Sequence, residues 1–388
     1  MKRILPAIVI AQFCCTSVWF AGNAIMGDIA RQLQLEPTYL AHLISAVQLG
    51  FIAGTLVFAI LGIADRFSPV KVFFCCALIS AVINLGAGIA GIDAWLLILC
   101  RFATGFFLAG IYPVGMKIAS DHYRQGLGKS LGFLVGALVL GTAFPHLLKS
   151  MIAVLPWKYV IYSTSILSAL GGCAMLLLVP DGPGRKHGQK LSFTGFLSGF
   201  KDSKFRAAAF GYFGHMWELY AFWVFIPVIL TAYKDRYPTA GFNVPLLSFL
   251  VIATGSISCI ASGLLSQRFG AKKIATLALF ISCICCVISP LLLFNSAELA
   301  FIIFLFIWSI AVIADSPLFS TLIAQNAPAV SKGSSLTIVN SVGFAITIVS
   351  IQLINALRSA ANAHYIYVLL AIGPVFGLLT LIKKDNEN

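Results

Sequence analysis

Runs of about 20 consecutive apolar residues recur along the whole chain, and they constrain its fold more than any other feature. A helix of about that length crosses a hydrocarbon core of about 30 Å. Sixty per cent of the 388 residues are hydrophobic and only 10% are charged, whereas a soluble protein of this size needs more charge to cover its surface. The sequence therefore predicts an all-α integral membrane protein.

The apolar runs predict about twelve membrane-spanning helices, six on each side of a polar central segment. We expect an N-terminal six-helix bundle over residues 1–179, a cytoplasmic loop over 180–206 and a C-terminal six-helix bundle over 207–388. The predicted spans are residues 4–26, 39–64, 71–92, 96–119, 129–151, 158–179, 207–233, 246–267, 273–295, 299–323, 335–357 and 364–383.

Basic residues are distributed unevenly between the two sides of the predicted membrane. If the N-terminus is cytoplasmic, nineteen of the 26 Lys and Arg residues lie on that side and six on the other, with Arg101 inside a span. The positive-inside rule then places both termini in the cytoplasm, and a bacterial inner membrane is the expected location. The run after Met1-Lys2-Arg3 is too long for a signal peptide, so it is predicted to be the first span.

The charged and reactive residues form none of the sequence patterns expected of a nucleic-acid-binding protein, a disulfide-bonded protein or an enzyme. The net charge of +13 comes from short basic clusters between apolar runs, which is not the pattern of a nucleic-acid interface. The ten cysteines all lie in apolar runs, where we expect apolar filler rather than disulfides, and Cys283, Cys285 and Cys286 lack neighbouring metal ligands. No catalytic triad, metal motif or phosphate loop indicates an enzyme, so no metal or cofactor is expected.

Two features repeat between the halves of the chain. Residues 65–71 read DRFSPVK in the loop after the second span, and residues 267–273 read QRFGAKK in the corresponding loop of the second half. Pro113 in the fourth predicted span is matched by Pro317 in the tenth. Together with the equal number of spans, these matches predict a duplicated six-helix unit.

With these features the sequence resembles the major facilitator superfamily of secondary transporters over essentially its full length. That family carries G-x-x-x-D-R-x-G-R-K in the loop between spans 2 and 3. The first copy has Leu61 and Ser68 where the family prefers glycine, and the second has Gln267 in place of the acid. The matching residues are Asp65, Arg66 and Lys71 in the first copy and Gly263, Arg268, Gly270, Lys272 and Lys273 in the second.

The fourth span is similar to the family's R-x-x-x-G pattern through Arg101 and Gly105, and Asp121 follows at its cytoplasmic end. The resemblance implies two bundles that flank a central cavity and rock between inward-open and outward-open states. It also implies a gating role for Asp65, Arg66, Asp121 and Arg268, the alternative being charge that only sets topology. The drug-antiporter motif of span 5 is half present, because Ala137 replaces its proline.

Charges inside a bilayer cost a few kcal/mol each on insertion scales, so those that are retained usually face a cavity. Of 13 acidic residues, only Glu218 in span 7 and Asp315 in span 10 fall inside predicted spans. His215 shares a helix face with Glu218, three positions away. We expect these three residues to exchange protons. The alternatives are a structural hydrogen-bonded pair for Glu218 and His215, and a cap at the helix break near Pro317 for Asp315.

Arg101 is the clearest buried cation of the first half. The resemblance implies that it either binds a substrate anion or organises that half through an ion pair. Lys117, near the end of the same span, is expected to snorkel. Other polar residues on the spans are candidates for substrate binding, although each alone could instead make a helix-packing hydrogen bond. These candidates are Trp19, Asn23, Gln48, Tyr112, Trp217, Tyr220 and Asn340.

The sequence thus predicts a monomeric, proton-coupled secondary transporter of a small polar metabolite, which is anionic if Arg101 binds it. Its expected partners are that small molecule, protons and the lipid bilayer. The alternative is efflux of drugs or of a secreted metabolite such as a siderophore. The aromatic share of 12% and the partial span 5 motif allow efflux, whereas the missing proline argues against it.

Overall fold

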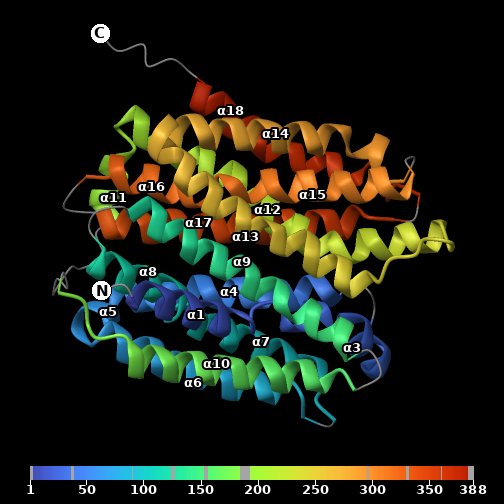
Figure 1. The fold of residues 1–388 in the computed structure, drawn as a ribbon, viewed down its shortest axis with the longest axis horizontal. Coiled ribbons are helices and arrows are strands. Elements are labelled where there is room, and N and C mark those ends of the chain that lie inside the picture. Colours follow the sequence, from blue (N-terminus) through green and yellow to red (C-terminus); the bar gives the residue numbers. More distant parts are fainter. Residues whose placement is uncertain are drawn as a thin grey trace. The chain divides into compact units, whose positions relative to one another are not determined.

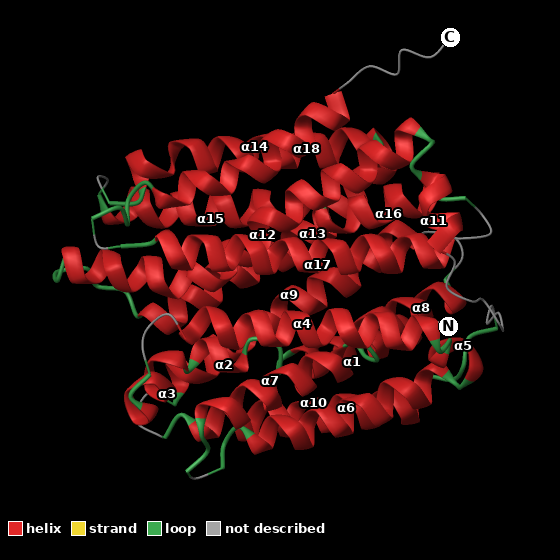
Figure 2. Cartoon of the chain, turned by 180° about the vertical axis from the view of Figure 1, so that it is seen from behind, coloured by secondary structure: helices red, strands yellow, loops and turns green. Residues whose placement is uncertain are grey.

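A computed structural model describes residues 3–35, 39–89, 91–123, 127–152, 156–183, 193–294, 297–328, 332–359 and 361–382. In these ranges every regular element is a helix (Figures 1 and 2). Ten of the helices in the described ranges are long and apolar enough to cross a membrane. Two shorter apolar helices, Ile4–Thr16 and Ile366–Ile382, lie where the first and last spans are predicted. The expected all-α membrane fold of about twelve spans is confirmed.

The chain separates into two compact units. Unit 1 comprises Met1–Lys190 and Phe242–Ser256, and unit 2 comprises Leu191–Gly241 and Ile257–Asn388. The helices up to residue 178 are α1 (Ile4–Thr16), α2 (Ala21–Ala24), α3 (Met26–Leu33), α4 (Tyr39–Ile60), α5 (Ile63–Arg66), α6 (Pro69–Gly86), α7 (Ala94–Leu108), α8 (Tyr112–His122), α9 (Leu127–Met151) and α10 (Lys158–Leu178). The remaining helices are α11 (Phe193–Gly199), α12 (Ser203–Arg236), α13 (Val244–Phe269), α14 (Ala271–Leu292), α15 (Glu298–Ala314), α16 (Ser316–Asn326), α17 (Lys332–Leu357), η1 (Ile366–Ala371) and α18 (Ile372–Ile382).

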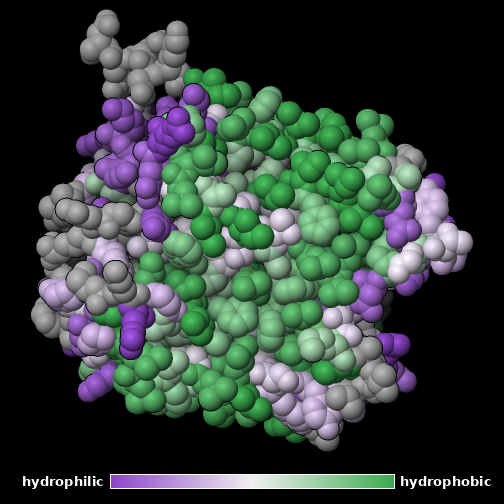
Figure 3. All heavy atoms as spheres, in the orientation of Figure 1, coloured by the Kyte–Doolittle hydropathy of each residue, from purple (hydrophilic) through white to green (hydrophobic). Residues whose placement is uncertain are grey.

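The exposed side chains along the middle of the helices are hydrophobic, and hydrophilic side chains gather at the helix ends (Figure 3). Leu170 in unit 1 and Leu379 in unit 2 are examples, with 60% and 68% of their surface exposed. A soluble protein rarely exposes apolar surface on this scale, whereas lipid covers it at no cost. The exposed faces of both units are therefore suited to a bilayer.

The fourth and tenth spans are broken at equivalent places. In unit 1, α7 ends at Leu108 and α8 begins at Tyr112, with Pro113 in its first turn. In unit 2, α15 ends at Ala314 and α16 begins at Ser316, with Pro317 in its first turn. Proline has no backbone N–H and therefore fits the first turn of a helix. The repeated prolines of the sequence mark the same helix break in both units.

Glycines let α4 and α7 cross with their backbones nearly in contact. A Cβ atom added at Gly105 would lie 2.0 Å from the Val47 carbonyl oxygen, and one added at Gly50 would lie 1.9 Å from the Phe102 carbonyl oxygen. Small residues permit such close approach between helices in lipid. Gly105 is the glycine of the R-x-x-x-G pattern, so this crossing also sets the position of Arg101 one turn earlier.

Replacing Gly105→Ala should lower the free energy of unfolding by roughly 1–3 kcal/mol, because the two backbones must move apart. Gly27→Ala is the control, since a Cβ atom there meets nothing within 4 Å. The melting temperature of the purified protein in detergent measures both. An unchanged melting temperature for Gly105→Ala would contradict the close crossing.

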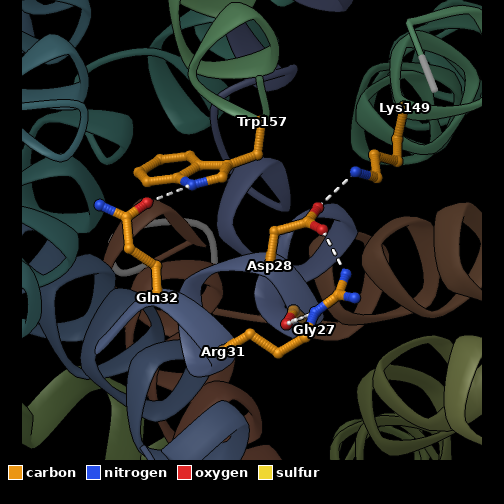
Figure 4. A network of polar contacts seen from close by, with 6 residues as sticks. All are labelled: Gly27, Asp28, Arg31, Gln32, Lys149 and Trp157. Carbon is orange, nitrogen blue, oxygen red and sulfur yellow. Dashed lines mark hydrogen bonds and ion pairs between the residues drawn. The ribbon is translucent and has the colours of Figure 1, made fainter. Parts of the chain in front are cut away.

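Helix α3 is held at one end of unit 1 by a polar network over an apolar cluster. Asp28 forms ion pairs with Arg31 at 2.7 Å and with Lys149 of α9, and Gln32 Oε1 accepts a hydrogen bond from Trp157 Nε1 at 2.8 Å (Figure 4). Arg31 Nε also donates to the Gly27 carbonyl oxygen at 3.1 Å. The apolar side chains of this cluster include Ala21, Ile25, Ile29, Leu43, Ile92 and Leu97. The first predicted span is thus followed by a separate short helix, α3, which these contacts hold in place.

Candidate functional site

Arg101 lies on α7 in unit 1 and is only 2% exposed. Its Nη2 donates hydrogen bonds to the carbonyl oxygens of Val18 at 3.1 Å and Trp19 at 2.5 Å, in the break between α1 and α2. Its Nη1 donates to Asn84 Oδ1 on α6 at 3.2 Å. All three acceptors are neutral. Among the residues that the structure describes, no carboxylate forms an ion pair with this guanidinium, so an organising ion pair is not observed there.

Asn84 connects Arg101 to a third helix. Besides accepting from Arg101, its Nδ2 approaches Ser165 Oγ at 2.9 Å, Thr164 Oγ1 at 3.1 Å and the Ile161 carbonyl oxygen at 3.3 Å, all on α10. The side chain is fully buried. The sequence does not distinguish Asn84, because it is one uncharged polar residue among several on the predicted spans. A buried amide bonded on all sides is a strong constraint on the helices around it.

Several predicted substrate-binding residues of unit 1 lie near the same break. The Trp19 ring packs 4.9 Å from that of Phe51 on α4, and Gln48 is one turn from Phe51 on the same face. Asn23 is on α2. The amide groups of Asn23 and Gln48 are buried and have no hydrogen-bond partner among the described residues. Tyr112 begins α8 and is also buried.

His146 is a buried ionisable residue of unit 1 that sequence analysis did not single out. It lies on α9 next to Pro145, and its Nε2 atom has no hydrogen-bond partner within the described ranges. A histidine inside a predicted span is the sequence signal that indicates His146, as it does for His215.

In unit 2, Glu218 lies near the middle of α12 and is 1% exposed. Its Oε1 accepts hydrogen bonds from Ser282 Oγ at 2.5 Å, Trp308 Nε1 at 2.6 Å and Cys286 Sγ at 3.1 Å. Its Oε2 has no hydrogen-bond partner among the described residues. The Cys286 thiol is thus a donor to the carboxyl group, which corrects the expectation that this cysteine is apolar filler.

His215 and Asp315 form a second buried cluster in unit 2. The His215 Nδ1 and Asp315 Oδ1 atoms are 2.8 Å apart, and each side chain is 1% exposed. Asp315 occupies the N-cap position of α16, but its side chain makes no capping hydrogen bond. The capping alternative is therefore not what the structure shows. His215 shares a helix face with Glu218 as predicted, but the two residues have different partners.

The remaining candidates of unit 2 occupy different environments. Trp217 Nε1 donates to the Leu369 carbonyl oxygen of η1 at 3.0 Å, which links α12 to the last span. Tyr220 is buried, and its ring lies 5.2 Å from the rings of Trp223 and Phe344. Asn340 is half-buried on α17. Trp217 thus makes a packing hydrogen bond, whereas Tyr220 is part of an aromatic cluster.

The loop motif of unit 1 brings together two of the predicted gating residues. Lys117 Nζ of α8 lies 3.1 Å from Asp65 Oδ1 and 3.8 Å from Asp121 Oδ2. Arg66 beside this cluster is exposed. In unit 2, the exposed Arg268 guanidinium lies 5.2 Å from the ring centre of its neighbour Phe269. Lys117, expected only to snorkel, therefore bridges the two acids.

Glycines with positive φ shape both loops of this motif. Gly270 in the second copy has φ +87° and directly precedes α14. In the first copy, Gly62 has φ +60° and directly precedes α5. It stands one residue after Leu61, the position where the family prefers glycine. The first copy therefore keeps a left-handed glycine next to the expected position.

The two units bury different ionisable groups. Unit 1 has a buried cation with neutral acceptors only, and unit 2 has two buried carboxyl groups and an imidazole. Within the described ranges, no group of three or more His, Cys, Asp or Glu side chains is placed to hold a metal ion. The ten cysteines are all unpaired thiols. Anion binding and proton exchange are the reactions that these groups can support.

Comparisons with known proteins were made for the whole chain. The family model described as Major Facilitator Superfamily matches residues 8–351. The uncharacterized transporter YgaY of Escherichia coli O157:H7 is 27% identical over 198 residues, and YgaY of Escherichia coli strain K12 is 26% identical over 198 residues. Each alignment covers 48% of this chain and 48% of the relative, so the chain spans about half the length of the curated relatives it matches.

The fold was also compared with solved structures. The crystal structure of the human organic anion transporter MFSD10 (TETRAN) matches with a TM-score of 0.76, over 98% of this chain and 99% of that one. The sequence identity is 12%, so this likeness concerns the fold alone.

Replacing Asn84→Ala should cost roughly 1–3 kcal/mol of unfolding free energy, because Arg101 and the α10 hydroxyl groups lose a buried partner. Asn340→Ala is the matched control, since Asn340 is half-buried and makes no hydrogen bond to another described residue. Thermal unfolding in detergent compares the two variants. Equal melting temperatures would contradict a stabilising role for the hydrogen bonds of Asn84 in unit 1.

Proposed function

Because the chain belongs to the major facilitator superfamily, we propose that it is a secondary active transporter that moves a small anionic metabolite by alternating access and couples this movement to protons. One observation carries the proposal. The membrane-spanning helices bury a cation that pairs with no carboxylate among the described residues of unit 1, and two carboxyl groups with an imidazole in unit 2. Such groups are expensive in lipid, so their retention indicates a function.

Arg101 supports the anionic class of substrate. A guanidinium has five N–H donors and binds carboxylates and phosphates in a planar, bidentate manner. The carbonyl oxygens of Val18 and Trp19 satisfy some of these donors but leave the positive charge uncompensated. An anion near the break between α1 and α2 would supply the missing charge. The unpartnered amides of Asn23 and Gln48 offer additional polar contacts in the same unit.

The carboxyl groups of unit 2 support proton coupling. Oε1 of Glu218 is bonded to three donors, whereas Oε2 has no partner among the described residues and is available to hold a proton. Asp315 faces His215 at 2.8 Å, and a carboxyl–imidazole pair can pass a proton from one group to the other. The break between α15 and α16 places Asp315 where a small helix movement would change that distance.

The Asp65, Lys117 and Asp121 cluster is proposed to stabilise one conformation of unit 1 during transport. Its ion pairs connect α5 to α8, and such contacts hold one arrangement of a loop while another requires them to separate. We further propose that the protein works as a monomer in a bacterial inner membrane with both termini in the cytoplasm. The charge asymmetry of the sequence supports that orientation.

The anion assignment predicts the behaviour of an Asn84→Asp variant. A carboxylate placed near Arg101 would act as a permanent counter-ion, so the Kd of an anionic substrate should rise about tenfold or more. Asn84→Ala removes the same amide without adding charge and should weaken binding much less. A thermal-shift screen of the wild type against a metabolite library identifies the ligand, because a compound that binds the folded state raises its melting temperature. Titration calorimetry then gives the Kd, and equal values in the two variants would refute the assignment.

The proton assignment predicts the behaviour of Glu218→Gln. The amide oxygen can still accept from Ser282 and Trp308, so the variant should fold, but it has no proton to release. In proteoliposomes with an imposed pH gradient, accumulation of the identified substrate should fall about fivefold or more, as coupling free energies of 1–3 kcal/mol imply. Glu298→Gln, at the start of α15, is the control and should accumulate substrate like the wild type. Unchanged gradient-driven uptake in Glu218→Gln would remove this residue from the coupling.

A further inference from the structure

Unit 1 has an apolar groove on the side of α4 and α7 that the transport proposal does not use. Its volume is about 530 Å³, and its lining includes Ala46 and Leu49 of α4 and Leu99 and Phe102 of α7. Leu49 and Leu99 are 53% and 60% exposed. Both helices are long and apolar enough to cross a membrane, so an acyl chain that runs along them can contact this groove.

One rim of the groove is polar. It carries Asp93, which directly precedes α7, and Trp95, which is 80% exposed. Tyr39 is the first residue of α4 and lies within electrostatic range of the Asp93 carboxylate. Tryptophan and tyrosine concentrate at the level of lipid head groups. This rim therefore lies where a head group meets the acyl chains.

The Asp93 carboxylate lacks a protein cation. It is exposed, and its Oδ1 accepts a hydrogen bond from the Leu96 backbone N–H at 2.7 Å. None of the basic residues in the described ranges forms an ion pair with it. Asp28 lies on α3, which packs on the apolar cluster that contains Ile92 and Leu97. Unlike Asp93, it is paired with both Arg31 and Lys149. The charge at the groove is thus open to a cationic ligand.

We propose that this groove binds a phospholipid with a primary-amine head group, whose ammonium lies on Asp93 and whose acyl chain covers Leu49, Leu99 and Phe102. The apolar floor suits a chain that runs along the helices, and the carboxylate complements an ammonium that has three N–H donors. A quaternary choline head group has no N–H to donate, and an anionic head group is repelled. The site therefore selects among lipids by head group.

The test uses the purified wild-type protein equilibrated with equal amounts of phosphatidylethanolamine and phosphatidylcholine of identical chains, followed by native mass spectrometry. The wild type should retain phosphatidylethanolamine about fivefold over phosphatidylcholine, because both head groups carry a positive charge but only the primary ammonium can donate hydrogen bonds to the carboxylate. Asp93→Asn should reduce this ratio to near one. The Asp93→Asn variant should still fold, because asparagine also caps a helix N-terminus.

Asp235→Asn is the matched control, since Asp235 is an exposed acid at the end of α12 and does not line the groove. It should keep the wild-type preference. The proposal is overturned if Asp93→Asn retains phosphatidylethanolamine as the wild type does, if Asp235→Asn loses the preference equally, or if phosphatidylcholine or phosphatidylglycerol binds the wild type as well as phosphatidylethanolamine.

Discussion

The absence of water in the hydrocarbon core is the constraint on which this structure depends. A polar group in a spanning helix must find a partner inside the protein or remain at a cost of several kcal/mol. Most buried polar groups here obey this rule, and Asn84 is the clearest case because its amide serves α6, α7 and α10 together. Among the described residues, the departures from the rule include Arg101, whose buried charge meets only neutral acceptors, Glu218 with one unpartnered oxygen, and the amides of Asn23 and Gln48. These are residues to which the proposed function assigns a role.

The same constraint explains how the fold positions these residues. Gly105 lets α7 approach α4 until their backbones nearly touch, and this places Arg101 against the break between α1 and α2. In unit 2, the break before Pro317 places Asp315 opposite His215 of α12. Both arrangements use an interrupted helix, where freed backbone groups are available to a neighbouring side chain. The two units thus build different chemistry on one duplicated framework.

The sequence predicted the spans and the duplication because both depend on local apolar length and on repeated residues. It also placed Glu218, Asp315 and Arg101 inside the membrane. It did not predict that the first span divides into α1, α2 and α3, or that α12 extends to Ser203 and Arg236, since tertiary contacts determine those boundaries. The partners of Glu218 were likewise hidden, because Ser282, Cys286 and Trp308 lie 64 to 90 residues away in sequence.

We propose that the buried carboxyl groups are retained because protons pass through them as an anion is carried. The most direct measurement is the proton exchange of the purified wild-type protein in weakly buffered detergent solution, followed with a pH-sensitive dye while the identified substrate is added. A proton-coupled carrier should bind or release protons on substrate binding in at least part of the range from about pH 5 to about pH 9, because linked sites change each other's affinity. Saturating substrate with no change in bound protons at any pH in this range would contradict the account.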